Sequence, residues 1–276
     1  MSELIKVAAI NDISGSSRCS LTVAMPILSA FGLQCCVLPT AVLSNHTGYD
    51  KYFFDDYTDK MEYFVMNWKE YKERFGCIYT GFLGSERQIE IAKNFFETFG
   101  DKDTKILVDP VMGDDGRIYS TYTRQMCDKM KYLIRYADVV TPNVTEAAIL
   151  SGTDYRGDDI CIDEARKMAE SICRLGAKNV VITGIRDGDK SGNYLLGEDG
   201  EFTCFSKTVP IRYSGTGDVF ASVLCGFLAK NGSVKNGVEF AAEFIRKSAR
   251  LSYEKGLTYL DGICFEKFLK DICLLD

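Results

Sequence analysis

Hydrophobic and polar positions along this chain follow two alternating patterns, short apolar runs rich in β-formers and longer stretches with helical spacing. The short runs predict strands at 4–10, 34–38, 76–79, 105–108, 138–141 and 179–183. The longer stretches predict helices at 20–31, 59–75, 85–99, 121–136, 145–151 and 163–175. Strands that alternate with helices in this way indicate an α/β fold, with a mostly parallel sheet covered on both faces.

The pattern changes in the last third of the chain. Residues 192–196 and 201–206 predict a β-hairpin around Gly197-Glu198-Asp199-Gly200. Helices are expected at 218–230, 233–254 and 265–272. Ser85 with Gln88, and Asn143 with Glu146, fit capping boxes at predicted helix starts. Since no repeat, linker or low-complexity stretch interrupts the pattern, we predict one domain over residues 1–276.

Polar segments follow the predicted strands, at 11–16, 44–49, 80–85, 109–114, 141–146 and 183–184. Each segment alone also fits an ordinary polar loop. Ligands of open α/β sheets bind outside the carboxyl ends of the strands, so we expect these segments to form one site on that edge.

The segment Ser214-Gly215-Thr216-Gly217-Asp218 stands directly before an apolar helical run. Its glycines permit a tight turn, and the N–H groups at the start of the helix suit phosphate. A carboxylate in such a site is suited to take a proton from a hydroxyl that attacks a phosphoryl group. Alternatively, Asp218 is only a favourable acid in the first helical turn.

Candidate ligands for a cation lie in the same polar segments. Asp109, Asp114 and Glu146 are the oxygen ligands that we expect for Mg²⁺, which needs only one or two carboxylates besides phosphate and water. Glu146 alternatively serves only the capping box. His46 is the sole histidine, and in a loop it fits a packed or hydrogen-bonded residue better than a general base. The chain has neither a Walker A motif nor Gly-x-Gly-x-x-Gly after the first strand, which disfavours P-loop and dinucleotide enzymes.

Composition narrows the class of protein. The net charge of −6 and the pI of about 5.1, without a basic stripe, argue against a nucleic-acid partner. No apolar run approaches the ~20 residues of a membrane span, so no membrane partner is expected. The start of the chain leads straight into a strand pattern, so we expect no signal peptide. Eleven scattered cysteines without a Cys-x-x-Cys pair predict reduced, mostly buried thiols in a cytoplasmic protein.

Five of these segments together resemble the pyridoxal (vitamin B6) kinases of the ribokinase-like superfamily. They are Ser44-Asn45-His46-Thr47-Gly48-Tyr49, Gly81-Phe82-Leu83-Gly84-Ser85, Asp109-Pro110-Val111-Met112-Gly113-Asp114, Thr141-Pro142-Asn143-x-x-Glu146 and Gly215-Thr216-Gly217-Asp218. The last marks the superfamily, and the first is more specific to B6 kinases. The resemblance implies a three-layer α/β/α sandwich with a mostly parallel central sheet, usually in a homodimer. It also implies phosphorylation of the 5′-hydroxymethyl of pyridoxal, pyridoxine or pyridoxamine by ATP with Mg²⁺, often assisted by K⁺.

The resemblance also implies roles for individual residues. Asp218 corresponds to the catalytic base, and the amides of Gly215, Thr216 and Gly217 correspond to the anion hole. Residues that correspond to substrate contacts are Asp12, His46, Thr47 and Phe82. Residues that correspond to nucleotide contacts are Asn143, Thr183 and the flap residue Tyr119. Residues that correspond to the acidic cluster around the cations are Asp109, Asp114 and Glu146.

One segment departs from the family pattern. Asp12, in Asn11-Asp12-Ile13-Ser14-Gly15, replaces the serine that contacts the substrate in better-known members. Asp12 either pairs with the ammonium of pyridoxamine or meets the ring nitrogen, a water or a loop amide, so the preferred vitamer stays open. A hydroxymethylpyrimidine kinase of thiamine synthesis is the nearest alternative, although that family usually has Cys at the position of Asp218. A non-catalytic module that binds a vitamer or a nucleotide is the alternative from another class.

Overall fold

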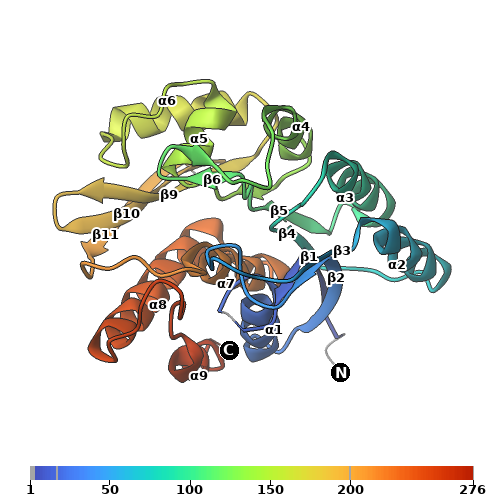
Figure 1. Ribbon diagram of the computed structural model, residues 1–276. Coiled ribbons are helices and arrows are strands. Elements are labelled where there is room, and N and C mark those ends of the chain that lie inside the picture. The colour runs from blue at the N-terminus through green and yellow to red at the C-terminus, as the bar shows by residue number, and fades with distance from the viewer. Residues whose placement is uncertain (1–3, 17, 199, 276) are drawn as a thin grey trace.

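The computed structural model describes residues 4–16, 18–198 and 200–275. Within them a sheet of nine strands forms the centre of the molecule (Figure 1). The strands are β1 (Lys6–Ser14), β2 (Gln34–Leu43), β3 (Phe54–Asp56), β4 (Cys77–Thr80), β5 (Lys105–Val108), β8 (Val139–Val140), β9 (Asn179–Asp187), β10 (Lys190–Gly197) and β11 (Gly200–Lys207). Their order is β11-β10-β9-β8-β5-β4-β1-β2-β3, parallel from β9 to β2 and antiparallel at both edges.

Helices cover both faces of this sheet (Figure 1). One face carries α1 (Leu21–Ala30), α7 (Thr216–Ala229), α8 (Val234–Glu254), the 3₁₀ turn Glu266–Phe268 and α9 (Leu269–Ile272). The other carries α2 (Thr58–Glu70), α3 (Glu86–Phe99), α4 (Arg124–Ile134), α5 (Val144–Ser151) and α6 (Ile162–Cys173). The predicted three-layer sandwich with a mostly parallel sheet is confirmed.

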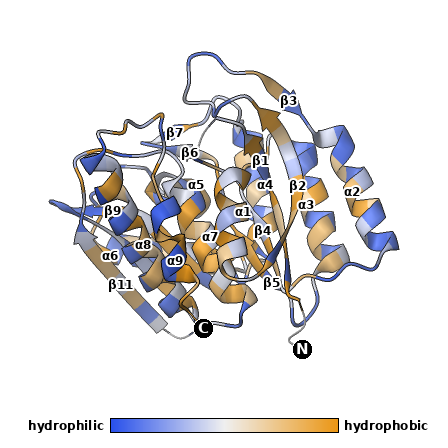
Figure 2. Cartoon of the chain, turned by 90° about the horizontal axis from the view of Figure 1, so that it is seen from below, coloured by the Kyte–Doolittle hydropathy of each residue, from blue (hydrophilic) through white to orange (hydrophobic). Residues whose placement is uncertain are grey.

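Alternation along the central strands explains the two hydrophobic cores. Ala8 and Ile10 of β1 face the core under α2–α6, whereas Val7 and Ala9 face the core under α1, α7 and α8. Successive side chains of a strand point to opposite faces, so a strand covered on both sides reads as one continuous apolar run. Figure 2 shows hydrophobic colour on the central strands and more polar colour along α2 at the periphery.

Most predicted elements are present, and the differences have local causes. The helix predicted at 59–75 ends at Glu70, because Lys72 adopts φ +53° and Phe75 turns back against Trp68. The sequence patterns missed β3 and a hairpin of β6 (Gly113–Asp114) and β7 (Arg117–Ile118), since two or three residues carry no measurable periodicity. Residues 1–3, 17, 199 and 276 lie outside the described residues, and residue 199 belongs to the predicted turn between β10 and β11.

Three further expectations can be compared with the structure. The capping box of Asn143 and Glu146 is confirmed. At Ser85 only half of the predicted capping box forms. Ser85 Oγ accepts from the Gln88 amide, but the Gln88 side-chain oxygen accepts from the Gly84 amide and not from the Ser85 amide. The expectation of mostly buried cysteines is wrong, since Cys19, Cys77, Cys127 and Cys225 are buried and the other seven are partly or fully exposed. Within residues 4–16, 18–198 and 200–275, no helix is long and apolar enough to cross a bilayer.

Candidate active site

One cavity of about 1000 Å³ lies at the carboxyl edge of the parallel strands. Every predicted site residue lines it: Asp12, His46, Thr47, Phe82, Asp109, Asp114, Tyr119, Asn143, Glu146, Thr183, Gly215, Thr216, Gly217 and Asp218. Parallel strands end at the same edge, so loops that are far apart in sequence meet there. The structure therefore brings the whole predicted set together on one cavity.

The start of α7 requires glycine at position 215, and Gly217 lies in its first turn. Gly215 caps the helix at φ +77°, and a Cβ there would lie 1.8 Å from the Arg18 carbonyl oxygen. A Cβ on Gly217 would lie 4.0 Å from Asp109 Oδ2, so this backbone runs close to a carboxylate across the cavity. The first N–H groups of a helix lack intrahelical acceptors and carry partial positive charge. The start of α7 is thus a built site for an anion.

Asp218 stands in the first turn of α7, partly exposed to the cavity yet surrounded by protein atoms. Its Oδ1 accepts a hydrogen bond of 3.2 Å from Asn11 Nδ2, and the Ser20 backbone supplies another hydrogen bond. Burial raises the pKa of Asp218 to about 6, and the charge of Asp12 adds to this, while the two hydrogen bonds oppose it. A carboxyl with that pKa is largely ionised at pH 7 and can still accept a proton.

Asp12 of β1 is buried and held by hydroxyl groups of β1 and of the residue that caps α1. Ser14 Oγ donates to Asp12 Oδ2 at 2.8 Å, and Ser20 Oγ donates to Oδ1 at 2.5 Å. Burial raises the pKa of Asp12, and these two hydroxyls oppose the increase. Ser20 itself adopts φ 54° and ψ −135°, a conformation that costs about 1–3 kcal/mol in a residue other than glycine. That strain is stored where one residue contacts two acidic groups of the cavity.

The loop after β2 places His46 by packing and hydrogen bonds. Its Nδ1 accepts from the Gly48 amide at 3.1 Å, and its ring lies 5.0 Å from the Tyr49 ring. Burial lowers the pKa of His46, and a hydrogen bond to the Leu260 backbone opposes this. These contacts fix the loop and favour a neutral imidazole. They support the expectation that His46 is a packed, hydrogen-bonded residue and not the base.

Phe82 reaches the cavity from the loop after β4. Its amide donates to Asn11 Oδ1 at 2.8 Å, and its carbonyl accepts from Thr40 Oγ1 at 2.9 Å. Its ring packs edge-on against Tyr122 at 6.4 Å. Two hydrogen bonds therefore hold the Phe82 backbone, and Tyr122 packs against its ring. Thr47 is exposed and lines the same cavity.

The three predicted cation ligands do not share one environment. Thr141 Oγ1 donates to Asp109 Oδ1 at 2.9 Å, and the two oxygens of Glu146 accept from the amides of Met112 and Asn143. Asp114 instead lies 3.7 Å from the Arg212 guanidinium. Within the described part of the chain, no three His, Cys, Asp or Glu side chains gather as a metal-binding group.

Electrostatics nevertheless fit a cation beside Asp109 and Glu146. Burial raises the pKa of Asp109 to about 7, and the charge of Asp218 adds to the increase. Burial and then the charge of Asp109 raise the pKa of Glu146 well above its usual range. Buried carboxylates that repel one another bind a proton or a cation favourably. Mg²⁺ suits such oxygens, and it takes its remaining ligands from phosphate and water.

The predicted nucleotide residues lie at one end of the cavity. Asn143, the N-cap of α5, forms an isolated parallel bridge with Thr183 in the middle of β9. Asn143 Nδ2 donates to the Gly113 carbonyl at 2.8 Å, which ties the β6–β7 hairpin to α5. Tyr119 follows that hairpin, and its amide donates to the Met112 carbonyl at 2.9 Å. Burial raises the pKa of Tyr119, so its phenol stays protonated.

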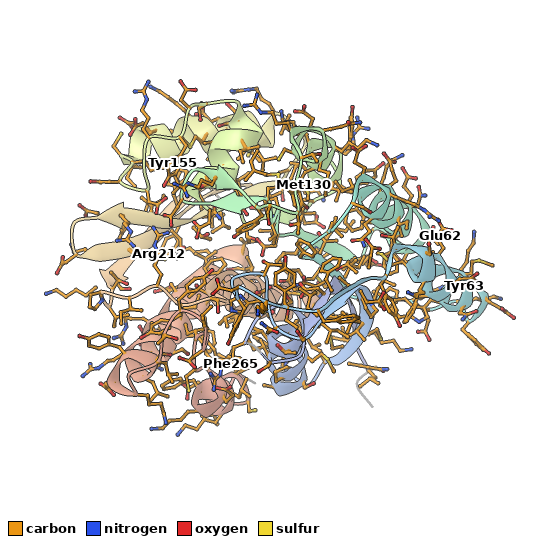
Figure 3. The ribbon with its side chains drawn as sticks, viewed as in Figure 1. Glu62, Tyr63, Met130, Tyr155, Arg212 and Phe265 are labelled. Atoms are coloured by element: carbon orange, nitrogen blue, oxygen red, sulfur yellow. The ribbon has the colours of Figure 1, made fainter. Side chains whose placement is uncertain are left out.

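An ion-pair cluster joins three loops at this end of the cavity. Arg212, in the loop before α7, bonds Asp115 at 2.6 Å and also pairs with Asp158 from the loop before α6. Tyr155 donates to Asp158 at 2.9 Å and packs against Gly116 of the hairpin turn. Figure 3 labels Arg212 and Tyr155 on the same side of the molecule, Arg212 at β10 and β11 and Tyr155 above it near α6. The cluster holds the hairpin in place over the cavity.

Sequence reasoning missed several residues of this site. Nothing in the sequence marks Arg212, and Asn11 and Asp218 are 207 positions apart. The hairpin did carry a signal, because Asp115-Gly116 is typical of a type I′ turn, and both residues have positive φ, 49° and 73°.

Residues 69–261 match the model of phosphomethylpyrimidine kinase. The chain belongs to the phosphomethylpyrimidine kinase family. Within it, the chain is similar to a Bacteroides thetaiotaomicron protein that is provisionally named a phosphomethylpyrimidine kinase and was solved with pyridoxal. The two share 37% identity with a TM-score of 0.93, over 98% of this chain and 96% of that chain.

Curated relatives of this phosphomethylpyrimidine kinase family member carry two kinds of name. A pyridoxine kinase of Bacillus subtilis is 31% identical over 63% of this chain and 64% of its own length. A hydroxymethylpyrimidine/phosphomethylpyrimidine kinase of Haemophilus influenzae is 33% identical over 60% of this chain and 61% of its own length. The chain thus matches less than two thirds of either relative. The predicted resemblance is confirmed for family and fold, while the phosphate acceptor is open between two classes.

Proposed function

We propose that this protein transfers the γ-phosphate of ATP to the 5′-hydroxymethyl group of a B6 vitamer: pyridoxal, pyridoxine or pyridoxamine. The observation that carries the proposal is the Asp218 carboxylate at the anion site of α7, in one cavity with Phe82 and the His46 loop. The Bacteroides thetaiotaomicron relative solved with pyridoxal supports the class of acceptor. Family membership supports ATP as the phosphate donor.

In the proposed reaction Asp218 accepts the proton of the 5′-hydroxyl as its oxygen attacks the γ-phosphorus. The bond from that phosphorus to the oxygen shared with the β-phosphate breaks, and ADP leaves with the bonding electrons. The proton then passes from Asp218 to water. A pKa of about 6 suits this role at neutral pH, because the carboxylate is mostly ionised before the step and takes up the proton during it.

The start of α7 would hold the negative charge that develops on the transferred phosphoryl group. Amides at a helix N-terminus are fixed before the reaction begins, so they need no reorganisation during it. Bound Mg²⁺, which we place beside Asp109 and Glu146, would neutralise charge on the phosphates. We also propose Asp114 as a Mg²⁺ ligand, because its carboxylate oxygens can bind a cation even with the Arg212 guanidinium 3.7 Å away. K⁺ remains a prediction from the resemblance.

The vitamer ring would lie against Phe82, with Asp12, His46 and Thr47 around its substituents. The phosphates and nucleoside would extend toward Asn143, Thr183 and Tyr119. With the vitamer ring held at Phe82 and the Asp218 carboxylate held at the start of α7, the 5′-hydroxyl would lie next to its base before transfer. Such positioning of the reacting groups lowers the barrier of the reaction.

Hydroxymethylpyrimidine phosphorylation is the second candidate, and the name of the family and of the Haemophilus influenzae relative favours it. Two features favour the B6 vitamers. Asp218 occupies the position where hydroxymethylpyrimidine kinases usually have Cys, and the segment 44–49 resembles the B6 kinases. A non-catalytic binding module is disfavoured, because a pure binder gains nothing from a carboxylate beside bound phosphate.

The test is phosphorylation by the purified protein with ATP and Mg²⁺, using the three vitamers and hydroxymethylpyrimidine as separate acceptors and detecting products by mass. We expect vitamer 5′-phosphates to form faster than hydroxymethylpyrimidine phosphate. The reverse preference would replace our proposal by the second candidate, and ligand binding without any phosphorylated product would replace it by the binding module.

Two further properties are proposed with this function. We propose a homodimer, which light scattering at micromolar concentration would test, with a monomer refuting it. We also propose a cytoplasmic location, which the eleven cysteines support, because all are free thiols.

A further inference from the structure

Asn11 has no role in the reaction described so far, yet it lies at its centre. It is fully buried near the end of β1, where the register with β2 shifts between Asn11 and Ile13. Such an irregularity re-aims side chains next to a site. Gly81 makes room for it, since a Cβ on Gly81 would lie 2.2 Å from Asn11 Nδ2.

The hydrogen bonds of Asn11 fix which end of its carboxamide faces the base. Its Oδ1 accepts from two backbone amides, Phe82 at 2.8 Å and Asp12 at 2.9 Å. Only an oxygen can accept from both, so Nδ2 must be the atom that faces Asp218 Oδ1 at 3.2 Å. One buried side chain thus connects the base to the residue that we place against the vitamer ring.

We propose that Asn11 is a positioning residue, which sets the direction of the Asp218 carboxylate relative to the ring held at Phe82. This rests on the proposed function. Asn11 donates to Oδ1 of Asp218, and the Ser20 backbone supplies a second hydrogen bond to the same carboxylate. A carboxylate has about four lone-pair sites, so it can still accept from the substrate hydroxyl. A carboxylate that rotates away loses the near-attack geometry, and a displacement of about 1 Å can cost on the order of 10²-fold in rate.

The competing explanation is that Asn11 only joins the loops after β1 and β4. Both explanations predict a less stable variant, so stability alone cannot separate them. They differ in catalysis, since an orienting contact to the base changes kcat, whereas a loop contact alone changes folding and the KM for the vitamer. They also differ in whether the effect depends on Asp218.

The test compares Asn11→Ala with Asn179→Ala in kcat, KM and Tm, using the best of the four acceptors. Asn179 is a matched control, because its side-chain amide is also buried and donates to the Asp138 carbonyl at 2.9 Å. It is the first residue of β9, so it lies at the amino end of the strands, opposite to the cavity. We expect Asn11→Ala to lower kcat on the order of 10–100-fold with KM changed less than about threefold. Asn179→Ala should lower Tm and leave kcat within about twofold.

A double-mutant cycle decides between the two explanations. Combined with Asp218→Asn, the Asn11→Ala change should lower kcat no further, because the oriented base is already gone. Equal losses of kcat in both backgrounds would overturn the proposal. If Asn11→Ala does not fold, Asn11→Asp serves instead, since it keeps the acceptor oxygen and places a repelling oxygen against Asp218. An unchanged kcat in Asn11→Asp would equally overturn it.

Failure of the two proposals would look different. Wild-type protein that transfers phosphate, with Asn11 variants of normal kcat, would overturn only the role of Asn11. Wild-type protein that transfers phosphate to none of the four acceptors would overturn the proposed function, and the role of Asn11 with it.

Discussion

The two sides of the cavity use acidic residues in opposite ways. On the side of β1 and α7, Asp12 and Asp109 are 5% and 6% exposed, and hydroxyl groups satisfy them. On the side of the β6–β7 hairpin, Asp115 has a side chain 66% exposed and pairs with the Arg212 guanidinium, which is joined also to Asp158. The first side holds these carboxylates by hydrogen bonds from hydroxyl groups, and the second holds them in ion pairs.

This difference separates the carboxylates that can bind a proton or a cation from those that hold loops together. Burial raises the pKa of Asp109 to about 7 and that of Asp218 to about 6, so both groups bind protons or cations near neutral pH. The ion pairs of Arg212 instead fasten three loops, and the exposed pair with Asp115 contributes only about 0–1 kcal/mol. The Asp158 side chain is only 11% exposed, so its pair is less screened by solvent. Changes on the first side should therefore alter catalysis, and changes on the second should alter loop order.

The largest effect is expected for Asp218→Asn, which keeps the shape of the side chain and removes the base. We expect kcat to fall on the order of 10²–10⁴-fold with vitamer binding nearly intact. In the wild type, kcat/KM should rise with pH through about 6 and then level off, because the ionised form is active and burial has raised the pKa. Steady-state kinetics and calorimetric binding measure both, and near-wild-type turnover in the variant would reduce Asp218 to a helix-end acid.

Asp12→Ser tests whether the buried side selects the vitamer. Pyridoxamine carries an ammonium group where pyridoxal has an aldehyde, and a hydrogen bond to a charged partner contributes roughly 1.5–3 kcal/mol. At about 1.4 kcal/mol per tenfold, the ratio of kcat/KM for pyridoxamine over pyridoxal should fall about 10- to 100-fold in the variant. Because Ser14 and Ser20 already bond Asp12, an equal ratio in both proteins would mean that Asp12 serves only these two hydroxyls.

Glu146→Gln should raise the Mg²⁺ concentration required for half-maximal activity, by about tenfold or more. The carboxamide keeps one acceptor oxygen, which suffices for the cap on α5, but it loses the acceptor for one of the two backbone amides and removes the charge that favours a cation. Titration of activity with Mg²⁺ measures this, with Tm recorded in parallel. A lower Tm together with an unchanged Mg²⁺ requirement would leave Glu146 with its capping role alone.

The smallest effect is expected for Arg212→Gln on the ion-paired side. Loss of its pairs with Asp115 and Asp158 should loosen the hairpin and raise the KM for ATP a few-fold. The Tm should fall as well, mainly through the pair with Asp158, whose side chain is 11% exposed. High salt should reproduce part of this in the wild type, because exposed charges are screened. Arg166→Gln is the control, since Arg166 makes comparable exposed pairs with Glu201 and Asp163 away from the cavity. An equal increase in KM for both variants would contradict the local role of Arg212.

The sequence alone predicted the layer architecture and the position of the site. Alternating strand and helix patterns implied a parallel sheet, and a parallel sheet places the ends of its strands on one edge. For that reason segments as distant as Asp12, Phe82 and Asp218 could be assigned to one site, and the structure places all of them on one cavity.

Contacts between distant segments were decided only by the tertiary structure. Local periodicity depends on neighbours in sequence, so it could not pair Asn11 with Asp218 or Arg212 with Asp158. Nor could it give the pKa of Asp109, because burial and the charge of Asp218 exist only once the chain is folded. The order of residues thus determined which groups reach the edge of the sheet, and packing determined which of them are buried, oriented and ready to accept a proton.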